Sequence, residues 1–381
     1  MKIVIAPDSF KGSLSSEAAA RAIQEGILRA LPDAEIVLIP IADGGEGTVD
    51  SLVQATQGKK VAVTVQGPLQ EPVTASYGVL GNGTTCVIEM AQASGLMLVP
   101  AAQRNPLITT TYGTGQLIKH ALDQGYRDFI LALGGSATND GGAGMLQALG
   151  LQLQDAEGRE LAPGGQALAQ LAQIDASQWD ARIQEAHFLL ASDVTNPFIG
   201  PHGASAVFGP QKGATPEMVA LLDQALAHWA DLIEAHTGKA VHDMPGAGAA
   251  GGLGGAFQAF FPSRTRRGVD VMIELTKLVE QLDGASLVIT GEGQTDGQTA
   301  SGKTPMGIAQ AAKLKGIPCI VLSGSLGKGI EKLYEHGVTS IHSIVNAPMS
   351  LQEAMSRTAE LLAQKAEQVM LTFLAGKRKE E

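Results

Sequence analysis

Short apolar runs alternate with helix-like segments at both ends of this chain, and this alternation constrains the fold more than any other feature. In roughly the first 60 residues, periodicity predicts strands over 2–6 and 35–41 and helices over 15–30 and 47–56, with Ser15 or Ser16 as N-cap of the first helix. The last hundred or so residues repeat this pattern three times. There the predicted strands are 286–290, 319–322 and 340–344, and the predicted helices are 305–315, 329–336 and 350–374. Such alternation predicts a parallel sheet with helical crossovers.

The two β-α units at one end and the three at the other add up to a five-stranded sheet of the flavodoxin-like type. The middle of the chain begins instead with alternating, turn-punctuated segments, which are typical of an antiparallel or mixed sheet. We therefore predict an α/β protein: a split flavodoxin-like parallel-sheet domain, residues 1–65 and 282–381, with a second α/β domain, residues 66–281, inserted into it. We expect the active site in a cleft between them, the usual place for a small-molecule site.

Composition excludes several classes of function. The 381 residues carry a formal net charge of −11, which argues against a nucleic-acid partner or an anionic membrane surface. No segment approaches the ~20 continuous apolar residues of a membrane span. The two cysteines, Cys86 and Cys319, support neither a disulfide framework nor a cysteine metal site. These features predict a cytoplasmic enzyme or binding protein without nucleic-acid or membrane partners.

Six predicted strands are each followed by a loop that combines glycine with Asp, Glu, Ser or Lys. These loops are residues 8–13, 42–47, 134–142, 192–197, 291–296 and 323–327. A single Asp-Gly after a strand is more often an ordinary turn. Six together, at the strand ends where parallel sheets bind ligands, indicate phosphate contacts through backbone N–H groups and Mg²⁺ held by carboxylates. That combination favours phosphoryl transfer.

Residues 297–304 formally satisfy the Walker A pattern of a P-loop, Gly-x-x-x-x-Gly-Lys-Thr. Two features argue against a true P-loop. Residues 291–296 intervene between the predicted strand and Gly297, and Pro305 suggests that the helix starts only there. We therefore expect Thr304 to be mainly a helix N-cap, and Lys303 to contact phosphate by another geometry.

Taken together, several segments resemble the bacterial type I glycerate kinase family. They are residues 6–13, 42–47, 106–115, 134–142, 192–197 and 291–305. The resemblance spans the chain except its charged C-terminal tail. It implies ATP-dependent phosphorylation of D-glycerate to 2-phosphoglycerate, and a two-domain α/β fold with a split flavodoxin-like domain. The spacing of the residues does not itself distinguish the C2 from the C3 hydroxyl.

Roles for individual residues follow from their chemistry. Lys11 is the predicted cation that stabilises the transferring phosphoryl group, and Asp193 is the predicted base for the substrate hydroxyl. Asp43, Glu292 and Asp296 are predicted Mg²⁺ ligands. The predicted substrate- or phosphate-binding residues are Asp8, Ser9, Gly44, Gly45, Gly134, Gly135, Ser136, Thr138, Asn139, Asp140, Asn196, Ser323 and Lys303.

Two other functions are compatible with these loops. One is a non-catalytic two-domain sensor of a phosphorylated small acid, and the other is a P-loop NTPase that uses Gly297 to Thr304. A sensor would not need several carboxylates facing its anionic ligand. The partners expected for the kinase are D-glycerate, ATP and Mg²⁺. The sequence leaves open the oligomeric state, the pathway, and which domain binds ATP.

Overall fold

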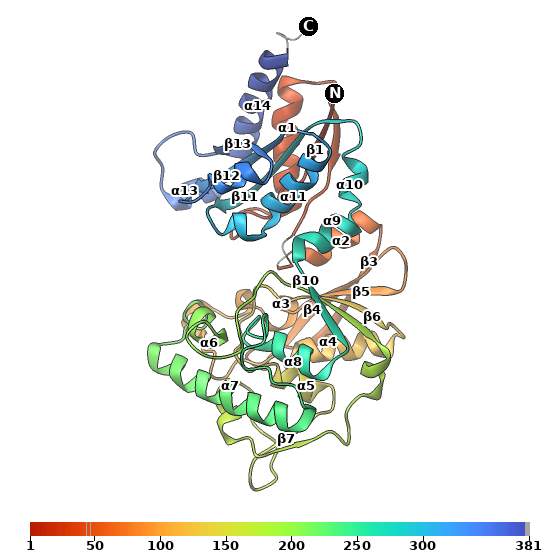
Figure 1. Cartoon of the computed structure of the whole chain (residues 1–381), viewed down its shortest axis with the longest axis vertical. Helices are drawn as coiled ribbons and strands as arrows, with labels where there is room; N and C mark the ends of the chain where they lie inside the picture. Colours follow the sequence, from red (N-terminus) through yellow and green to blue (C-terminus); the bar gives the residue numbers. More distant parts are fainter. Residues whose placement is uncertain (43, 46, 378–381) are drawn as a thin grey trace. The chain divides into compact units, whose positions relative to one another are not determined.

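The computed structural model describes residues 1–42, 44–45 and 47–377, except the side chain of Ser301, and it divides into two compact units. Unit 1 consists of Met1–Asp43, Asp50–Ala55 and Arg267–Glu381, and unit 2 consists of Gly44–Val49 and Thr56–Arg266. Unit 1 is therefore built from both ends of the chain, the red and blue ends of the colour scale in Figure 1. The divisions lie near residues 55 and 267, whereas the sequence predicted 65 and 282.

Unit 1 contains a five-stranded parallel sheet with the order β13-β12-β11-β1-β2. Its strands are β1 (Lys2–Ile5), β2 (Glu35–Leu38), β11 (Ala285–Thr295), β12 (Cys319–Leu326) and β13 (Val338–Ser343). Numbered along the chain, this order reads 2-1-3-4-5, which is the flavodoxin-like order. The predicted sheet type is confirmed. β11 and β12 run further than predicted, because their pairing continues from Val288 opposite Cys319 to Thr295 opposite Leu326.

The helices of this unit include those that pack on the sheet, and α2 belongs to the unit only in part. They are α1 (Ser16–Ala30), α2 (Thr48–Thr56), α9 (Gly268–Leu275), α10 (Leu278–Gln281), α11 (Thr304–Leu314), α12 (Lys332–Glu335), α13 (Leu351–Ser356) and α14 (Thr358–Lys377), with a 3-10 turn, η6 (Thr299–Ser301). The Ser15 hydroxyl accepts a 3.2 Å hydrogen bond from the N–H of Ala18, which confirms Ser15 as N-cap of α1. The single helix predicted over 350–374 is two helices, α13 and α14.

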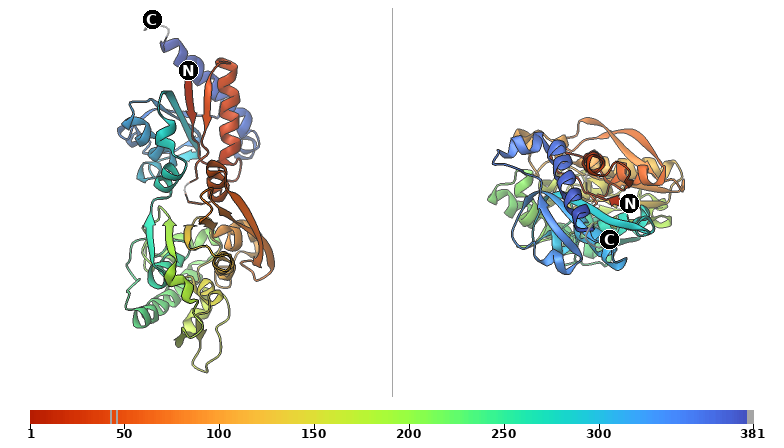
Figure 2. Two further views of the ribbon diagram at one scale, coloured as in Figure 1. Left: turned by 90° about the vertical axis from the view of Figure 1, so that its right-hand side faces the viewer. Right: turned by 90° about the horizontal axis from the view of Figure 1, so that it is seen from above.

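The apolar side chains of each strand alternate between the two faces. Ile3 and Ile5 of β1 pack in one core with α1 and α14, the two helices that lie side by side in Figure 2. A Cβ on Gly26 of α1 would lie 2.0 Å from the carbonyl oxygen of Ala363, so a glycine is needed for α1 and α14 to approach this closely.

Unit 2 contains a six-stranded mixed sheet with the order β10-β9-β6-β5-β4-β3. Its strands are β3 (Lys59–Gln66), β4 (Pro72–Val79), β5 (Thr85–Glu89), β6 (Asp128–Ala132), β9 (His187–Ala191) and β10 (Ser263–Arg266), and β7 (Gln152–Gln154) pairs separately with β8 (Gln173–Asp175). β3, β4 and β5 pair antiparallel, whereas β5, β6, β9 and β10 pair parallel. The prediction of a mixed sheet for this part of the chain is confirmed.

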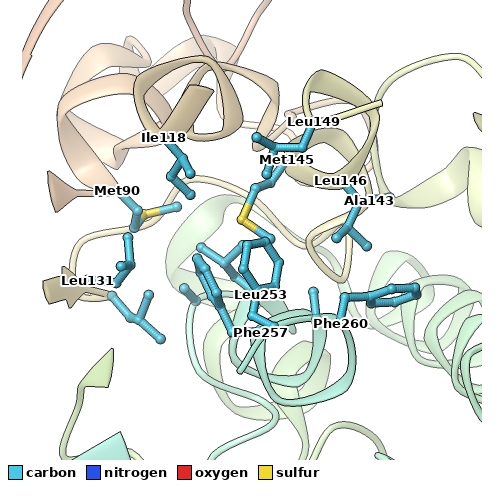
Figure 3. Packing of buried hydrophobic residues seen from close by; sticks show 14 of the residues in the cluster. Met90, Ile118, Leu131, Ala143, Met145, Leu146, Leu149, Leu253, Phe257 and Phe260 are labelled. Atoms are coloured by element: carbon cyan, nitrogen blue, oxygen red, sulfur yellow. The ribbon is translucent and has the colours of Figure 1, made fainter. Parts of the chain in front are cut away.

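The helices of unit 2 pack around one large apolar core. They are α3 (Ala91–Ser94), α4 (Tyr112–Asp123), α5 (Ala143–Ala148), α6 (Ala204–Phe208), α7 (Pro216–Thr237) and α8 (Leu253–Phe260), with 3-10 turns η1 (Leu96–Leu98), η2 (Ala101–Gln103), η3 (Gly165–Gln170), η4 (Ala181–Glu185) and η5 (Pro210–Lys212). Figure 3 shows Ile118 of α4, Met145 of α5 and Phe257 of α8 gathered in this core. Cys86 and Cys319 are buried and unlinked. Across the described part of the chain, every helix is too short or too polar to cross a membrane.

Candidate functional site

A cavity of about 740 Å³ opens at the carboxyl ends of the strands of unit 1. Its walls come from the loops after β1, β11 and β13 and from the carboxyl ends of β11 and β12, and six predicted site residues line it: Asp8, Ser9, Lys11, Glu292, Asp296 and Lys303. The strand order of the sheet reverses between β1 and β11, and open α/β sheets bind ligands at such a switch point. The volume is also typical of a small-molecule site, roughly 300–1,000 Å³.

Two carboxylates of this cavity lie on β11 and just after it. The Oε1 atom of Glu292 accepts hydrogen bonds from Thr299 Oγ1 at 2.6 Å and from Thr295 Oγ1 at 3.1 Å. Burial raises the pKa of Glu292, while the bond from Thr299 and the charge of Lys303 oppose that rise. Asp296 accepts a 2.8 Å bond from the N–H of Gln298 on Oδ1. These contacts fix both carboxyl groups at the wall of the cavity, which Lys303 also lines.

Asp8 connects the loop after β1 to the start of α11. Its carboxylate is only 5% exposed; Oδ1 accepts a 2.6 Å bond from the N–H of Ser9, and Oδ2 accepts a 2.9 Å bond from Thr304 Oγ1. The N-cap of α11 is Lys303, and no side chain caps this helix. The expectation that Thr304 is mainly an N-cap is therefore wrong. Its hydroxyl instead holds a buried carboxylate at the edge of the cavity.

The structure also changes the interpretation of residues 297–304. Because β11 continues to Thr295, one residue rather than six separates the strand from Gly297, so this reason for rejecting a P-loop is wrong. The loop still does not lead directly into a helix, since η6 interrupts it before α11 begins at Thr304. Lys303, which ends this loop, lines the cavity as a half-buried cation.

A second group of predicted residues lies in unit 2, at the ends of the neighbouring parallel strands β6 and β9. The N–H of Gly134 donates a 3.2 Å bond to the carbonyl of Gly44, and a Cβ on Gly134 would lie 2.6 Å from the Cα of Gly45. A Cβ on Gly44 would lie 2.7 Å from the carbonyl oxygen of Ala191, the last residue of β9. The glycines that the sequence singled out are thus required by close backbone approach.

Asp193 and Asn196 follow β9 in this second group. Both are half-buried, and the Nδ2 of Asn196 donates a 2.8 Å bond to the carbonyl of His202. Gly135 has a φ of +78°, and Ser136 is buried beside it on the loop after β6. Asp43, the third predicted Mg²⁺ ligand, lies outside the described residues.

Thr138, Asn139 and Asp140 are completely buried in unit 2. The carboxylate of Asp140 accepts bonds from the N–H and hydroxyl of Thr111, both at 2.8 Å, and from two backbone N–H groups of the turn that follows. Burial raises the pKa of Asp140, and these bonds oppose the rise. The Asp140 side chain therefore holds the loop in place, and Asn139 donates a 2.9 Å bond from Nδ2 to the hydroxyl of Ser205. The hydroxyl of Thr138 has no hydrogen-bond partner among the described residues.

Ser323 of unit 1 is also buried rather than lining the cavity. Its hydroxyl accepts a 3.0 Å bond from the N–H of Thr295 and donates a 2.7 Å bond to the carbonyl of Ser325. It therefore links the extended ends of β11 and β12. Gly324 and Ser325 line the cavity instead.

Lys212 is a buried charged residue that sequence reasoning missed. Its side chain is only 1% exposed, and its Nζ donates a 2.6 Å bond to the carbonyl of Thr138. Burial lowers the pKa of Lys212 to about 7, against the opposing effect of the negative charge of Asp140. Its position in a Pro-Gln-Lys-Gly turn gives no sign of burial. The loop after β6 thus depends on a lysine from a distant segment.

Among the residues that the structure describes, no group of three or more His, Cys, Asp and Glu side chains is arranged to hold a metal ion. Glu292 and Asp296 form a pair of carboxylates on one cavity. Two carboxylates suffice for Mg²⁺, which usually keeps several waters and takes its other ligands from substrate phosphates.

Comparison with known proteins gives consistent results. The chain matches the model of the Glycerate kinase family over residues 3–374. It is 50% identical to a glycerate kinase of Bacillus subtilis (strain 168) and 46% identical to a glycerate 2-kinase of Escherichia coli (strain K12), with 99% of each chain covered in both cases. A crystal structure described as glycerate kinase 2 from Salmonella typhimurium LT2 matches with a TM-score of 0.85, 49% identity and 99% coverage of both chains. These matches confirm the resemblance inferred from the sequence motifs and the α/β fold class predicted from the alternation of strands and helices.

Replacement of Thr304 tests its bond to Asp8. In Thr304→Val the buried carboxylate of Asp8 loses a donor, so we expect the free energy of unfolding to fall by ~1–3 kcal/mol. Thr304→Ser keeps a hydroxyl and should lose less than half of that amount. Urea denaturation monitored by circular dichroism measures both variants. Equal stabilities of the Val and Ser variants would contradict this role.

Lys212 predicts a pH-dependent stability. Between about pH 7 and 10.5, the unfolded lysine keeps a proton that the folded one has lost, so folding stability attributable to Lys212 rises with pH. The difference in unfolding free energy between wild type and Lys212→Met should rise by up to ~1.4 kcal/mol per pH unit in that window and be flat below pH 7. Denaturation series at several pH values measure it. A difference that is constant from pH 7 to 10 would refute the burial effect.

Proposed function

We propose, because this chain belongs to the glycerate kinase family, that it transfers the γ-phosphoryl group of ATP to the 2-hydroxyl of D-glycerate in the presence of Mg²⁺. Membership of this family shows that the chain is a kinase. The use of ATP, the requirement for Mg²⁺ and attack by the 2-hydroxyl are what we propose. The observation that carries the proposal is the cavity of unit 1, where Lys11, Lys303, Glu292 and Asp296 line one space. Phosphoryl transfer depends on such positioning and charge more than on covalent chemistry by the protein.

The residues of the cavity fit a magnesium triphosphate. Glu292 and Asp296 would hold Mg²⁺, whose charge would neutralise the phosphate oxygens when it is bound. Lys303 would contact the phosphates beside the metal site, and Lys11, exposed on the loop after β1, would stabilise charge on the transferring group. Lys11 and Lys303 line the cavity together with the carboxyl groups of Asp8, Glu292 and Asp296.

Glycerate would be bound by unit 2. Backbone N–H groups of the glycine-rich loop from Gly135 to Asn139, other than that of Ala137, would bind its carboxylate, and Asp140 and Lys212 would hold this loop in position. Asp193 would accept the proton of the 2-hydroxyl while the oxygen of that hydroxyl forms a bond to the γ-phosphorus. The bond from that phosphorus to the β–γ bridging oxygen breaks at the same time, and ADP leaves.

The identity with a relative named glycerate 2-kinase supports attack by the 2-hydroxyl. A P-loop NTPase would hydrolyse ATP without an acceptor, and a sensor would not consume ATP. We expect ATP consumption that requires both D-glycerate and Mg²⁺, measured in a coupled assay, and 2-phosphoglycerate as the product in phosphorus NMR. ATP consumption without D-glycerate would contradict D-glycerate as the phosphoryl acceptor. 3-Phosphoglycerate as the main product would contradict attack by the 2-hydroxyl.

Lys11→Ala tests the cation on the loop after β1. Loss of one charge directed at the transition state typically costs about 10²–10³-fold in kcat. We expect a fall in that range with an unchanged circular dichroism spectrum, because Lys11 is exposed. Lys59→Ala, which removes an exposed lysine of β3, is the matched control and should retain wild-type activity. A Lys11→Ala enzyme with more than about a tenth of wild-type turnover would remove Lys11 from the mechanism.

A further inference from the structure

The cavity of unit 1 changes in character from one strand end to the next. Following the sheet from its centre to its edge, the lining residues are Asp8 and Lys11 after β1, Glu292 and Asp296 on and after β11, Gly324 and Ser325 on β12, and Ile344 and Val345 after β13. The lining is therefore charged at β1 and β11, small and polar at β12, and apolar at β13. Three strand intervals of about 4.8 Å separate β1 from β13, or roughly 14 Å.

The apolar end extends beyond β13 into the following loop and helix. Met349, Leu351 and Met355 line it, and Leu351 is 77% exposed at the first position of α13. Methionine side chains are flexible and polarizable, so they pack well against flat rings. Of the rings in the described chain, only Phe10 lines this cavity, and it is itself buried. A planar ligand at this end would therefore be held mainly by aliphatic and thioether groups.

This apolar end is held in a defined position. The hydroxyl of Ser13, after β1, donates a 2.6 Å bond to the carbonyl of Met355 at the end of α13. The Ser350 hydroxyl caps α13 by accepting a 3.2 Å bond from the N–H of Glu353. The loop that carries the charged end is thus tied to the helix that carries the apolar end. Such preorganisation reduces the entropic cost of binding a ligand that spans both.

We propose that the adenine ring of ATP binds at the apolar end of this cavity, against Val345, Met349 and Leu351, with its triphosphate directed toward Lys303 and Glu292. The inference rests on the proposed function and deepens it, because it assigns the nucleotide to unit 1. A three-carbon hydroxy acid has no apolar face that would need such a wall. A ligand with a flat apolar base at one end and several negative charges at the other matches the whole length of the lining.

Leu351→Asp tests the proposal, because Leu351 is exposed enough for the variant to fold. We expect the Kd of Mg-ADP, measured by isothermal titration calorimetry on the full chain, to rise by about tenfold or more, as for the loss of part of a buried leucine contact. The KM for ATP should rise in parallel, while the KM for D-glycerate stays within about twofold. Leu314→Asp is the matched control, because Leu314 is 87% exposed on α11 of the same unit and does not line the cavity.

Binding of inorganic tripolyphosphate distinguishes the contribution of the adenine base to affinity from that of the phosphates. It has the charged part of the nucleotide and no ring, so we expect its affinity to be the same in wild type and Leu351→Asp. Met349→Asp should behave like Leu351→Asp. Unchanged ADP affinity in both variants, or an equal loss of ADP and tripolyphosphate affinity, would overturn the adenine site.

The same experiment separates this inference from the proposed function. A wild-type protein that phosphorylates D-glycerate, with variants that bind ADP normally, would overturn the adenine site alone. A wild-type protein that binds ADP, with both variants impaired but no turnover of D-glycerate, would overturn the proposed reaction and support the adenine site.

Discussion

The parallel pairing of β1 with β11 is the constraint on which the rest of unit 1 depends. It joins residues about 280 positions apart in the sequence, with Ile3 opposite Leu287 and Ile5 opposite Ile289. The pairing continues past the strand, since the N–H of Asp8 donates to the carbonyl of Gly291 at 2.8 Å. Because β2 leaves on the other side of β1, the strand order reverses here. The loop of Asp8 and the carboxylate of Glu292 must therefore meet at one edge of the sheet.

The charge of the site follows from this geometry. Parallel strands bring the ends of distant segments together, so an acidic chain can still gather Lys11 and Lys303 at one cavity. The bond between Thr304 and Asp8 then fixes the start of α11 against the loop after β1. In unit 2 the same principle operates between β6 and β9, where glycines allow three loops to approach closely. Each unit thus presents one glycine-bearing edge with charged or polar groups.

The sequence predicted the parts of the fold that depend on local pattern. Apolar periodicity identified every strand of the unit 1 sheet, and the count of β-α units predicted its flavodoxin-like type. The extension of β11 to Thr295 was not predictable, because residues 291–295 carry turn-forming glycines and are held extended by pairing with β12. The first domain division shifted because β3 pairs with β4 in a hairpin and therefore belongs to the sheet of unit 2.

The site residues were likewise predictable only where local sequence pattern determines their position. Residues on strand-end loops were predictable from glycine and charge, and six of them line the unit 1 cavity. The positions of Thr304 and Lys212 were not predictable, because each forms a hydrogen bond with a residue remote in sequence. Thr304 bonds to Asp8, and Lys212 bonds to Thr138. Burial of Asp140 was equally invisible, since an Asp in a glycine-rich turn is usually solvent-exposed. Local pattern indicates which residues gather, and tertiary packing decides which of them face a ligand.

A crystal structure of the protein with Mg²⁺ and a non-hydrolysable ATP analogue tests the central claim, that unit 1 holds the nucleotide. We predict the base against Val345 and Met349 after β13, and the triphosphate and metal beside Lys303 and Glu292. Analogue bound instead at the loop after β6 of unit 2, with the cavity of unit 1 empty, would contradict it.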